Sequence, residues 1–191
     1  LSFHWSFSKS LIDSIQNKKL VDNGSFLTRN RFNEPELALS IRENQLSFED
    51  DFVLINSSEF TISFWFKSYD FEQNISILYF RNDDNQNNLL RLNYFSSEER
   101  VHLNIEINYI GLNENLIIDN TNMSLNKWYH FTLSVDWKQI RFYIDSNLVN
   151  SKSHNMPLKV DNKFLKGNMS LIGFGENQNF DIDELKIYNI S

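Results

Sequence analysis

The chain has 191 residues, with 18 Lys and Arg against 25 Asp and Glu, a net charge of −7 and no cysteine. The acidic balance argues against nucleic-acid binding, which normally uses a basic patch, and the lack of cysteine excludes disulfides and thiolate chemistry. No apolar run approaches the roughly 20 residues of a membrane span, so we expect no membrane insertion. The length favours a single domain over residues 1–191. Because the chain starts at Leu1, we expect an excised or processed segment.

Alternation of apolar and polar residues predicts β-strands with one buried face along much of the chain. Segments with this period are residues 1–8, 60–66, 101–107, 131–137 and 140–144. Short polar stretches with turn residues separate them, and helical spacing is weak throughout. Many short strands with tight turns predict an all-β fold, either a sandwich or a barrel.

Five segments keep a common order and spacing along almost the whole chain. They are WSFSKSLIDS (5–14), RNRFNEPELALS (29–40), FTISFWF (60–66), KWYHFTLSV with FYID (127–135 and 142–145) and IDELKIYN (182–189). In these segments the chain resembles laminin-G-like, concanavalin A-like jelly-roll domains. The resemblance implies an antiparallel β-sandwich of two curved sheets, with adjacent N- and C-terminal strands. The receptor-binding jelly roll of clostridial neurotoxins is a more remote relative, which these segments fit less well.

The chain departs from the family pattern at several turns. Ser8 and Lys9 stand where the family often has Asp-Gly, and Asn33 stands at another glycine. Ser146 replaces the glycine of the usual Asp-Gly hairpin after Asp145. We expect that hairpin to be less regular or to hold serine at a costly positive φ. The serine at position 8 removes an often-acidic position near the terminal strands.

Asp183 has the most informative setting among the acids. We expect it to share the inward face of the last strand with Leu185 and Ile187, where a carboxylate needs hydrogen-bond donors, a cation or a metal. One interpretation is a structural anchor bonded to backbone N–H groups or to a hydroxyl in the N-terminal turn. The other is a Ca²⁺ site with Asp13 and Asp181, because Ca²⁺ gathers oxygens from several loops and some relatives hold it at a rim. No other cofactor is expected.

Polar side chains on two strands form a candidate ligand-binding face. His102, Asn104 and Glu106 alternate with apolar residues on one strand, and Arg141 and Tyr143 do so on another. If these strands are neighbours on one curved sheet, their outward side chains form a groove suited to a sugar or peptide. Solvent-facing sheet residues without a ligand would give the same pattern.

Catalysis finds little support in the sequence. A retaining glycosidase needs two carboxyl groups about 5–5.5 Å apart on an open face. Asp181 and Asp183 are spaced as i and i+2, but we expect both to point inward, and the third acid seen in related hydrolases is missing. The four histidines show no catalytic motif. No catalytic residue is therefore predicted.

Asn-x-Ser sequons are possible glycosylation sites. There are six, at Asn23, Asn56, Asn74, Asn122, Asn168 and Asn189. Since the chain is rich in asparagine and serine, this number only slightly exceeds chance. The sequons give weak support to glycosylation and to an extracellular setting.

Function is implied here by resemblance. It points to a non-enzymatic recognition or adhesion module of a larger extracellular or cell-surface protein, which binds a glycan or protein through rim loops or the concave sheet. One alternative is a structural spacer that contacts other domains of the parent chain. A more remote alternative is a jelly-roll glycoside hydrolase, because a fold does not decide a function.

Overall fold

The computed structural model describes most of the chain. The described residues are 3–12, 14–15, 17, 19–21, 25–42, 45–48, 59–69, 74–81, 88–97, 100–109, 112–121, 123–136, 138–153, 169–172 and 179–189. They form strands and turns. No helix within these ranges is long and apolar enough to cross a membrane.

Each of the five alternating segments of the sequence holds one strand, and ten further strands of the described residues lie outside these segments. The strands are β1 (Phe3–Trp5), β2 (Leu20–Val21), β3 (Phe26–Thr28), β4 (Ala38–Arg42), β5 (Gln45–Phe48), β6 (Phe60–Ser68), β7 (Asn74–Arg81), β8 (Asn88–Ser97), β9 (Arg100–Tyr109), β10 (Leu112–Thr121), β11 (Tyr129–Val135), β12 (Gln139–Ile144), β13 (Asn147–Ser153), β14 (Met169–Ile172) and β15 (Asn179–Asn189).

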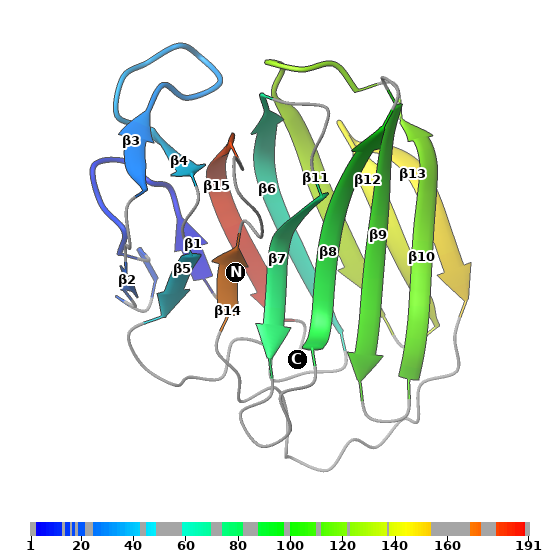
Figure 1. The fold of residues 1–191 in the computed structure, drawn as a ribbon. Coiled ribbons are helices and arrows are strands. Elements are labelled where there is room, and N and C mark those ends of the chain that lie inside the picture. The colour runs from blue at the N-terminus through cyan, green and yellow to red at the C-terminus, as the bar shows by residue number, and fades with distance from the viewer. Residues whose placement is uncertain are drawn as a thin grey trace.

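These strands build two antiparallel sheets, as Figure 1 shows. The eight-stranded sheet has the order β13-β12-β11-β6-β15-β4-β3, with β1 paired to β15. The seven-stranded sheet has the order β10-β9-β8-β7-β14-β5-β2. In β1, Phe3 lies opposite Ile187 of β15, so the two terminal strands are adjacent. The predicted jelly-roll sandwich is confirmed.

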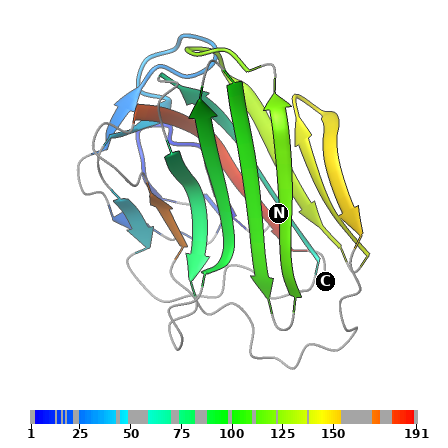
Figure 2. The same ribbon diagram turned by 45° about the vertical axis from the view of Figure 1, so that its right-hand side comes forward.

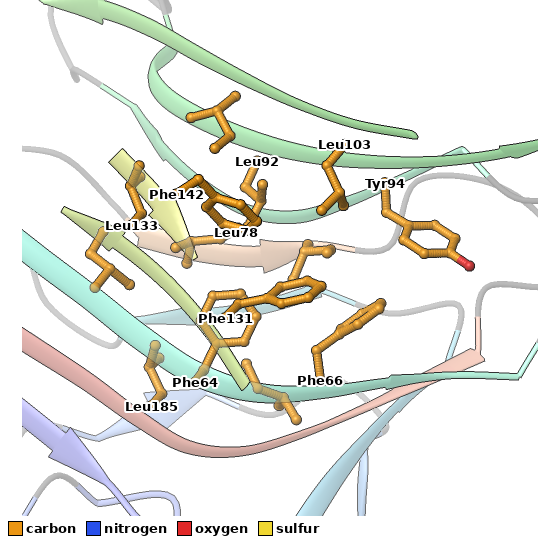
Figure 3. Close-up of a cluster of buried hydrophobic side chains, with 14 of the residues drawn as sticks. Phe64, Phe66, Leu78, Leu92, Tyr94, Leu103, Phe131, Leu133, Phe142 and Leu185 are labelled. Carbon is orange, nitrogen blue, oxygen red and sulfur yellow. The ribbon is translucent and has the colours of Figure 1, made fainter. Parts of the chain in front are cut away.

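The core lies between the sheets and is rich in phenylalanine. Figure 3 shows the side chains of the two sheets meeting, with Leu92, Leu103 and Tyr94 on one side and Phe64, Phe66 and Phe131 on the other. The Phe131 ring stacks on Phe66 at 5.3 Å between centroids, and Phe64 meets it edge-on at 5.6 Å. Burial of these aromatic side chains stabilises the sandwich without any disulfide.

One side of the sandwich is closed by side chains that reach from one sheet to the other. From β13, the Asn150 amide Nδ2 donates to the Ile117 carbonyl of β10 at 2.8 Å. Lys152 Nζ donates to the Asn115 carbonyl at 3.3 Å. Both strands end their sheets, and Figure 2 shows the two layers side by side. These bonds satisfy edge carbonyls that would otherwise be open to another strand.

Three positions where the resemblance led us to expect glycine adopt a conformation that glycine favours. The φ angles of Lys9, Asn33 and Ser146 are 61°, 65° and 67°. In the β12–β13 hairpin, Asp145 also has positive φ, at 50°, which is the geometry of a type I′ turn. The Asp145 carboxylate accepts a hydrogen bond from the His130 N–H at 2.8 Å and so braces this turn. The expected serine at positive φ is confirmed.

We expect Ser146→Gly to stabilise the domain by up to about 1 kcal/mol, because glycine adopts a positive φ without the steric cost that serine pays. Ser151→Gly in the adjacent strand β13 is the matched control, and it should destabilise by about 0.5–1 kcal/mol. Urea unfolding of both variants measures the difference. Equal effects of the two substitutions would contradict the strain at Ser146.

Candidate functional site

A β-bulge in β15 decides which way the acidic residues point. Glu184 has a φ of 53°, and the register between β15 and β6 shifts just after Asp183. One extra residue reverses the faces of all that follow. Asp183 therefore lies opposite Trp65 on the outer face of the eight-stranded sheet, while Leu185 and Ile187 are buried in the core. The prediction that Asp183 shares their face is wrong, although its burial is confirmed.

The partner of Asp183 is a cation from the turn between β3 and β4. Arg31 Nη1 donates to Asp183 Oδ2 at 2.7 Å. Its guanidinium lies 4.5 Å from the Phe32 ring and 4.9 Å from the Trp65 ring. Burial raises the pKa of Asp183 to about 6, although Arg31 acts to lower it. Asp183 is thus anchored by the Arg31 guanidinium together with a hydrogen bond from the backbone of Glu184, and among the described residues no hydrogen bond to it from the N-terminal turn is found.

Asn30 holds the turn that carries Arg31. Its side-chain Oδ1 accepts hydrogen bonds from the N–H groups of Phe32, at 2.9 Å, and Glu34, at 3.0 Å. Its Nδ2 donates to Glu34 Oε2 at 2.8 Å. A side chain that bonds the backbone two residues ahead closes an Asx turn. The turn is therefore fixed locally before Arg31 reaches across to Asp183.

Asp181 has a basic partner as well. Lys67 Nζ lies 2.6 Å from its Oδ2, and the Tyr69 hydroxyl donates to the same oxygen. The Lys67 ammonium also lies 4.7 Å from the Tyr69 ring and 4.8 Å from the Trp128 ring. Each of the two aspartates is thus neutralised by its own cation.

A calcium ion at these residues would have to displace the two basic partners. Asp181 and Asp183 are engaged by Lys67 and Arg31, and Asp13 lies outside the described residues. Within the described part of the chain, no group of three or more His, Cys, Asp or Glu side chains is placed to hold a metal. The calcium site stays a prediction.

The predicted groove is wrong in its composition. His102, Asn104 and Glu106 lie on β9 of the seven-stranded sheet, whereas Arg141 and Tyr143 lie on β12 of the eight-stranded sheet. Figure 2 shows the two sheets as separate layers. Arg141 instead pairs with Asp136 at 2.7 Å. The structure brings the first three residues together and separates the other two from them.

The true neighbours of the β9 residues come from β8. Because Leu90, Leu92 and Tyr94 of β8 are buried in the core, the residues between them point outward. The resulting outward surface, which we name the β8–β9 polar face, consists of Arg91, Asn93, His102, Asn104 and Glu106. Across the strands, Arg91 lies opposite Glu106 and Asn93 lies opposite Asn104.

An amide–carboxylate network joins three residues of this face. Asn104 Nδ2 donates to Glu106 Oε1 at 3.0 Å, and Asn93 Nδ2 approaches the same oxygen at 3.4 Å. The Asn93 side chain is almost fully buried, at 1% exposure. Asn104 Oδ1 is a buried acceptor with no hydrogen-bond partner in the described structure. On the neighbouring strand β10, Ile117 lies opposite Asn104 and is 57% exposed. The face therefore combines fixed polar groups with an apolar surface.

Sequence reasoning missed Arg91 and Asn93, although the alternation of Leu90, Leu92 and Tyr94 could have revealed them. It also missed Arg31 and Lys67 as partners of the aspartates, which no local pattern marks.

The sequons lie mostly beyond what the structure describes. Asn23, Asn56, Asn122 and Asn168 are outside the described residues. Asn74 begins β7 and Asn189 ends β15. Glycosylation at all six positions stays a prediction.

Comparison with protein families shows to which superfamily the chain belongs. A family model described as the concanavalin A-like lectin/glucanases superfamily matches residues 42–191. The chain belongs to this superfamily. Its description covers sugar-binding and sugar-cleaving proteins alike, so membership leaves both activities open. No curated protein sequence matches the chain.

Solved structures with a similar fold include neurotoxin binding domains. The botulinum neurotoxin serotype D binding domain is 15% identical, with a TM-score of 0.68, over 100% of this chain and 48% of that chain. The serotype D ligand binding domain in complex with N-acetylneuraminic acid is 16% identical, with a TM-score of 0.69, over 99% and 48%. The botulinum neurotoxin DC binding domain in complex with rat synaptotagmin II is 12% identical, with a TM-score of 0.66, over 99% and 48%. The chain spans about half the length of these structures, and the likeness concerns the fold.

We expect Arg31→Met to lower the free energy of unfolding of this chain by about 3–5 kcal/mol, because the substitution leaves the Asp183 carboxylate buried without a counter-charge. The double variant Arg31→Met/Asp183→Asn should recover part of this loss in urea unfolding. Arg29→Met is the matched control, since that exposed arginine donates to the Asn33 carbonyl and should change stability by less than about 1 kcal/mol. Equal losses at the two arginines would contradict the anchor.

The unfolding free energy should also depend on pH through Asp183. Its folded pKa of about 6 exceeds the ordinary 3.8, so its contribution to stability is full at low pH and is lost as pH rises through about 6. We expect Asp183→Asn to gain about 1–3 kcal/mol relative to the wild type between about pH 4 and about pH 7. Burial lowers the pKa of His130, which acts in the opposite direction but equally in both proteins. A pH-independent difference in urea midpoints would contradict this assignment.

Proposed function

We propose that this domain is a non-catalytic glycan-recognition module of a larger extracellular or cell-surface protein, with the β8–β9 polar face as its binding site. The observation that carries the proposal is the network in which Asn93 and Asn104 hold the Glu106 carboxylate. Fixed amide and carboxylate groups beside the exposed Ile117 suit a sugar, whose hydroxyls need polar partners and whose C–H face needs an apolar one. Membership of a lectin/glucanase superfamily supports this class of ligand.

The surroundings of Glu106 argue for binding rather than cleavage. A glycosidase uses a pair of carboxyl groups that flank the bond. The residues directly opposite Glu106 are Arg91 on β8 and Asn115 on β10, and the next outward residue on β9 is Asn104. None of these three carries a carboxyl group. Asp181 and Asp183 lie on the other sheet, where burial and their cations remove them from a substrate.

The ligands named for the similar structures agree in kind with this proposal. The serotype D domain is described in complex with N-acetylneuraminic acid. A further similar structure belongs to botulinum neurotoxin type C, whose cell entry is described as dependent on interaction with two ganglioside molecules. A synaptotagmin complex also appears among them, so a protein ligand is a second candidate for the recognition role. Since these structures are twice as long as this chain, their ligands indicate only a class.

Glycan-array binding of the 191-residue chain tests the proposal. We expect bound glycans to lose about tenfold or more in affinity for Asn104→Ala, because a hydrogen bond to a fixed polar group is lost. Tyr143→Ala on the opposite sheet is the control and should bind as the wild type does. If no glycan binds, or if Tyr143→Ala alone abolishes binding, the proposed function or its site is overturned. Circular dichroism checks that each variant is folded.

A further inference from the structure

We propose that Lys67 and Asp181 form a covalent amide cross-link between β6 and β15, by condensation of the lysine amine with the aspartate carboxyl group. The step uses no co-reactant and releases one water molecule. It takes place on the outer face of the eight-stranded sheet and does not depend on the ligand of the β8–β9 polar face. In a chain without cysteine, this amide holds two strands together covalently, as a disulfide does in other proteins.

Neighbouring strands hold the two side chains in register. Lys67 lies directly opposite Asp181 in the antiparallel pair of β6 and β15, and its Nζ lies 2.6 Å from Asp181 Oδ2. Both strands lie inside the eight-stranded sheet, with β11 beyond β6 and β4 beyond β15 (Figure 1). The reacting groups therefore stay together without a loop that has to close over them. Well-oriented groups within one molecule react as if at a local concentration of roughly 10⁵–10⁸ M.

Water is largely excluded from this pair. Asp181 is fully buried, and the Lys67 side chain is 13% exposed. The ring centroids of Tyr69 and Trp128 lie 4.7 and 4.8 Å from Nζ. Because burial disfavours charged groups, transfer of a proton from the ammonium to the carboxylate, which gives a neutral amine and a neutral acid, costs less here than in water. A dry site also protects the amide from hydrolysis.

The condensation balances within the pair and one neighbour. After the proton transfer, the Nζ lone pair attacks Cγ of Asp181, so that the N–C bond forms and the C=O electron pair moves onto Oδ1. The Tyr69 hydroxyl, which donates to Oδ2, gives its proton to that oxygen and takes one from Nζ. The Cγ–Oδ2 bond then breaks, Oδ2 leaves as water, and the Cγ=Oδ1 double bond is restored. One ammonium and one carboxylate thus become one neutral amide and one water molecule.

A hydroxyl on the next strand suits the oxygen that stays. Asp181 Oδ1 is buried and accepts no hydrogen bond from any described residue. Ser40 lies directly opposite Asp181 on β4, and its Oγ is likewise buried without a partner among the described residues. Side chains directly opposite each other on one face of an antiparallel pair lie close together. The Ser40 hydroxyl can therefore donate to Oδ1 as negative charge develops there during the attack.

Two other ion pairs of β15 serve as comparisons. Arg31 holds Asp183, but a guanidinium keeps its proton and does not act as a nucleophile. Lys186 Nζ lies 2.6 Å from Glu184 Oε2, at the same distance as in the proposed cross-link. These two side chains are 30% and 23% exposed, and His4 contacts the same carboxylate oxygen. Since water reaches this lysine, we expect it to remain in an ion pair.

Intact mass spectrometry of the denatured, unglycosylated 191-residue chain tests the proposal. We expect the chain to be lighter than its sequence by the mass of one water molecule. Lys67→Arg keeps the positive charge but cannot form the amide, so its mass should equal that of its sequence. Lys186→Arg is the matched control and should keep the loss of water. Tandem mass spectrometry of a protease digest should find the peptide of Lys67 joined to that of Asp181.

A wild-type chain at the full mass of its sequence would overturn the proposal, and this measurement needs no variant to fold. A loss of water that persists in Lys67→Arg, or that the digest places elsewhere, would overturn it as well. Tyr69→Phe tests the proton transfer to Oδ2. Cross-linking, followed as mass against time in newly purified chain, should slow by about a hundredfold or more. An unchanged rate would overturn the role of Tyr69, and circular dichroism checks that each variant is folded.

Discussion

The β-bulge at Glu184 is the constraint on which the outer face of the eight-stranded sheet depends. Before it, Phe180 and Ile182 are buried in the core, and after it Leu185 and Ile187 are. A strand without the extra residue could not keep both pairs inward, because side chains alternate strictly between faces. The bulge thus allows one long strand to supply core residues at both ends. It also directs Asp183 outward, where an arginine can reach it.

The polar groups on the outer faces of the two sheets have different kinds of partner. On the eight-stranded sheet, Asp181 and Asp183 are each closed by one cation from another element, and aromatic rings cover those cations. The Arg31–Asp183 pair joins the β3–β4 turn to the sheet, and the Lys67–Asp181 pair joins the neighbouring strands β6 and β15. On the seven-stranded sheet, the amides of Asn93 and Asn104 hold one oxygen of the Glu106 carboxylate. Buried side-chain oxygens without a hydrogen-bond partner occur on both sheets, at Asp181 Oδ1 and at Asn104 Oδ1, so they do not distinguish the two faces.

Two residues of this chain adopt a backbone conformation that glycine favours. Lys9 and Ser146, at positions where the family resemblance led us to expect glycine, have positive φ. The hydrogen bonds around each turn, such as the one from His130 to the Asp145 carboxylate, impose the conformation against the preference of the side chain. The resemblance to the family could therefore be recognised from strand sequences despite the missing glycines.

The sequence by itself determined the all-β class, several of the strands and much of the core, because period-two alternation and aromatic content act locally along each strand, whereas the choice of a sandwich over a barrel came from the family resemblance. It also indicated that Asp183 is buried and that His102, Asn104 and Glu106 share a face. Only the tertiary structure decided that β9 and β12 lie in different sheets, and that Arg31 and Lys67 neutralise the aspartates. Strand pairing and ion pairing join residues far apart in the chain, and a one-residue bulge reverses a face without any mark in the alternation before it.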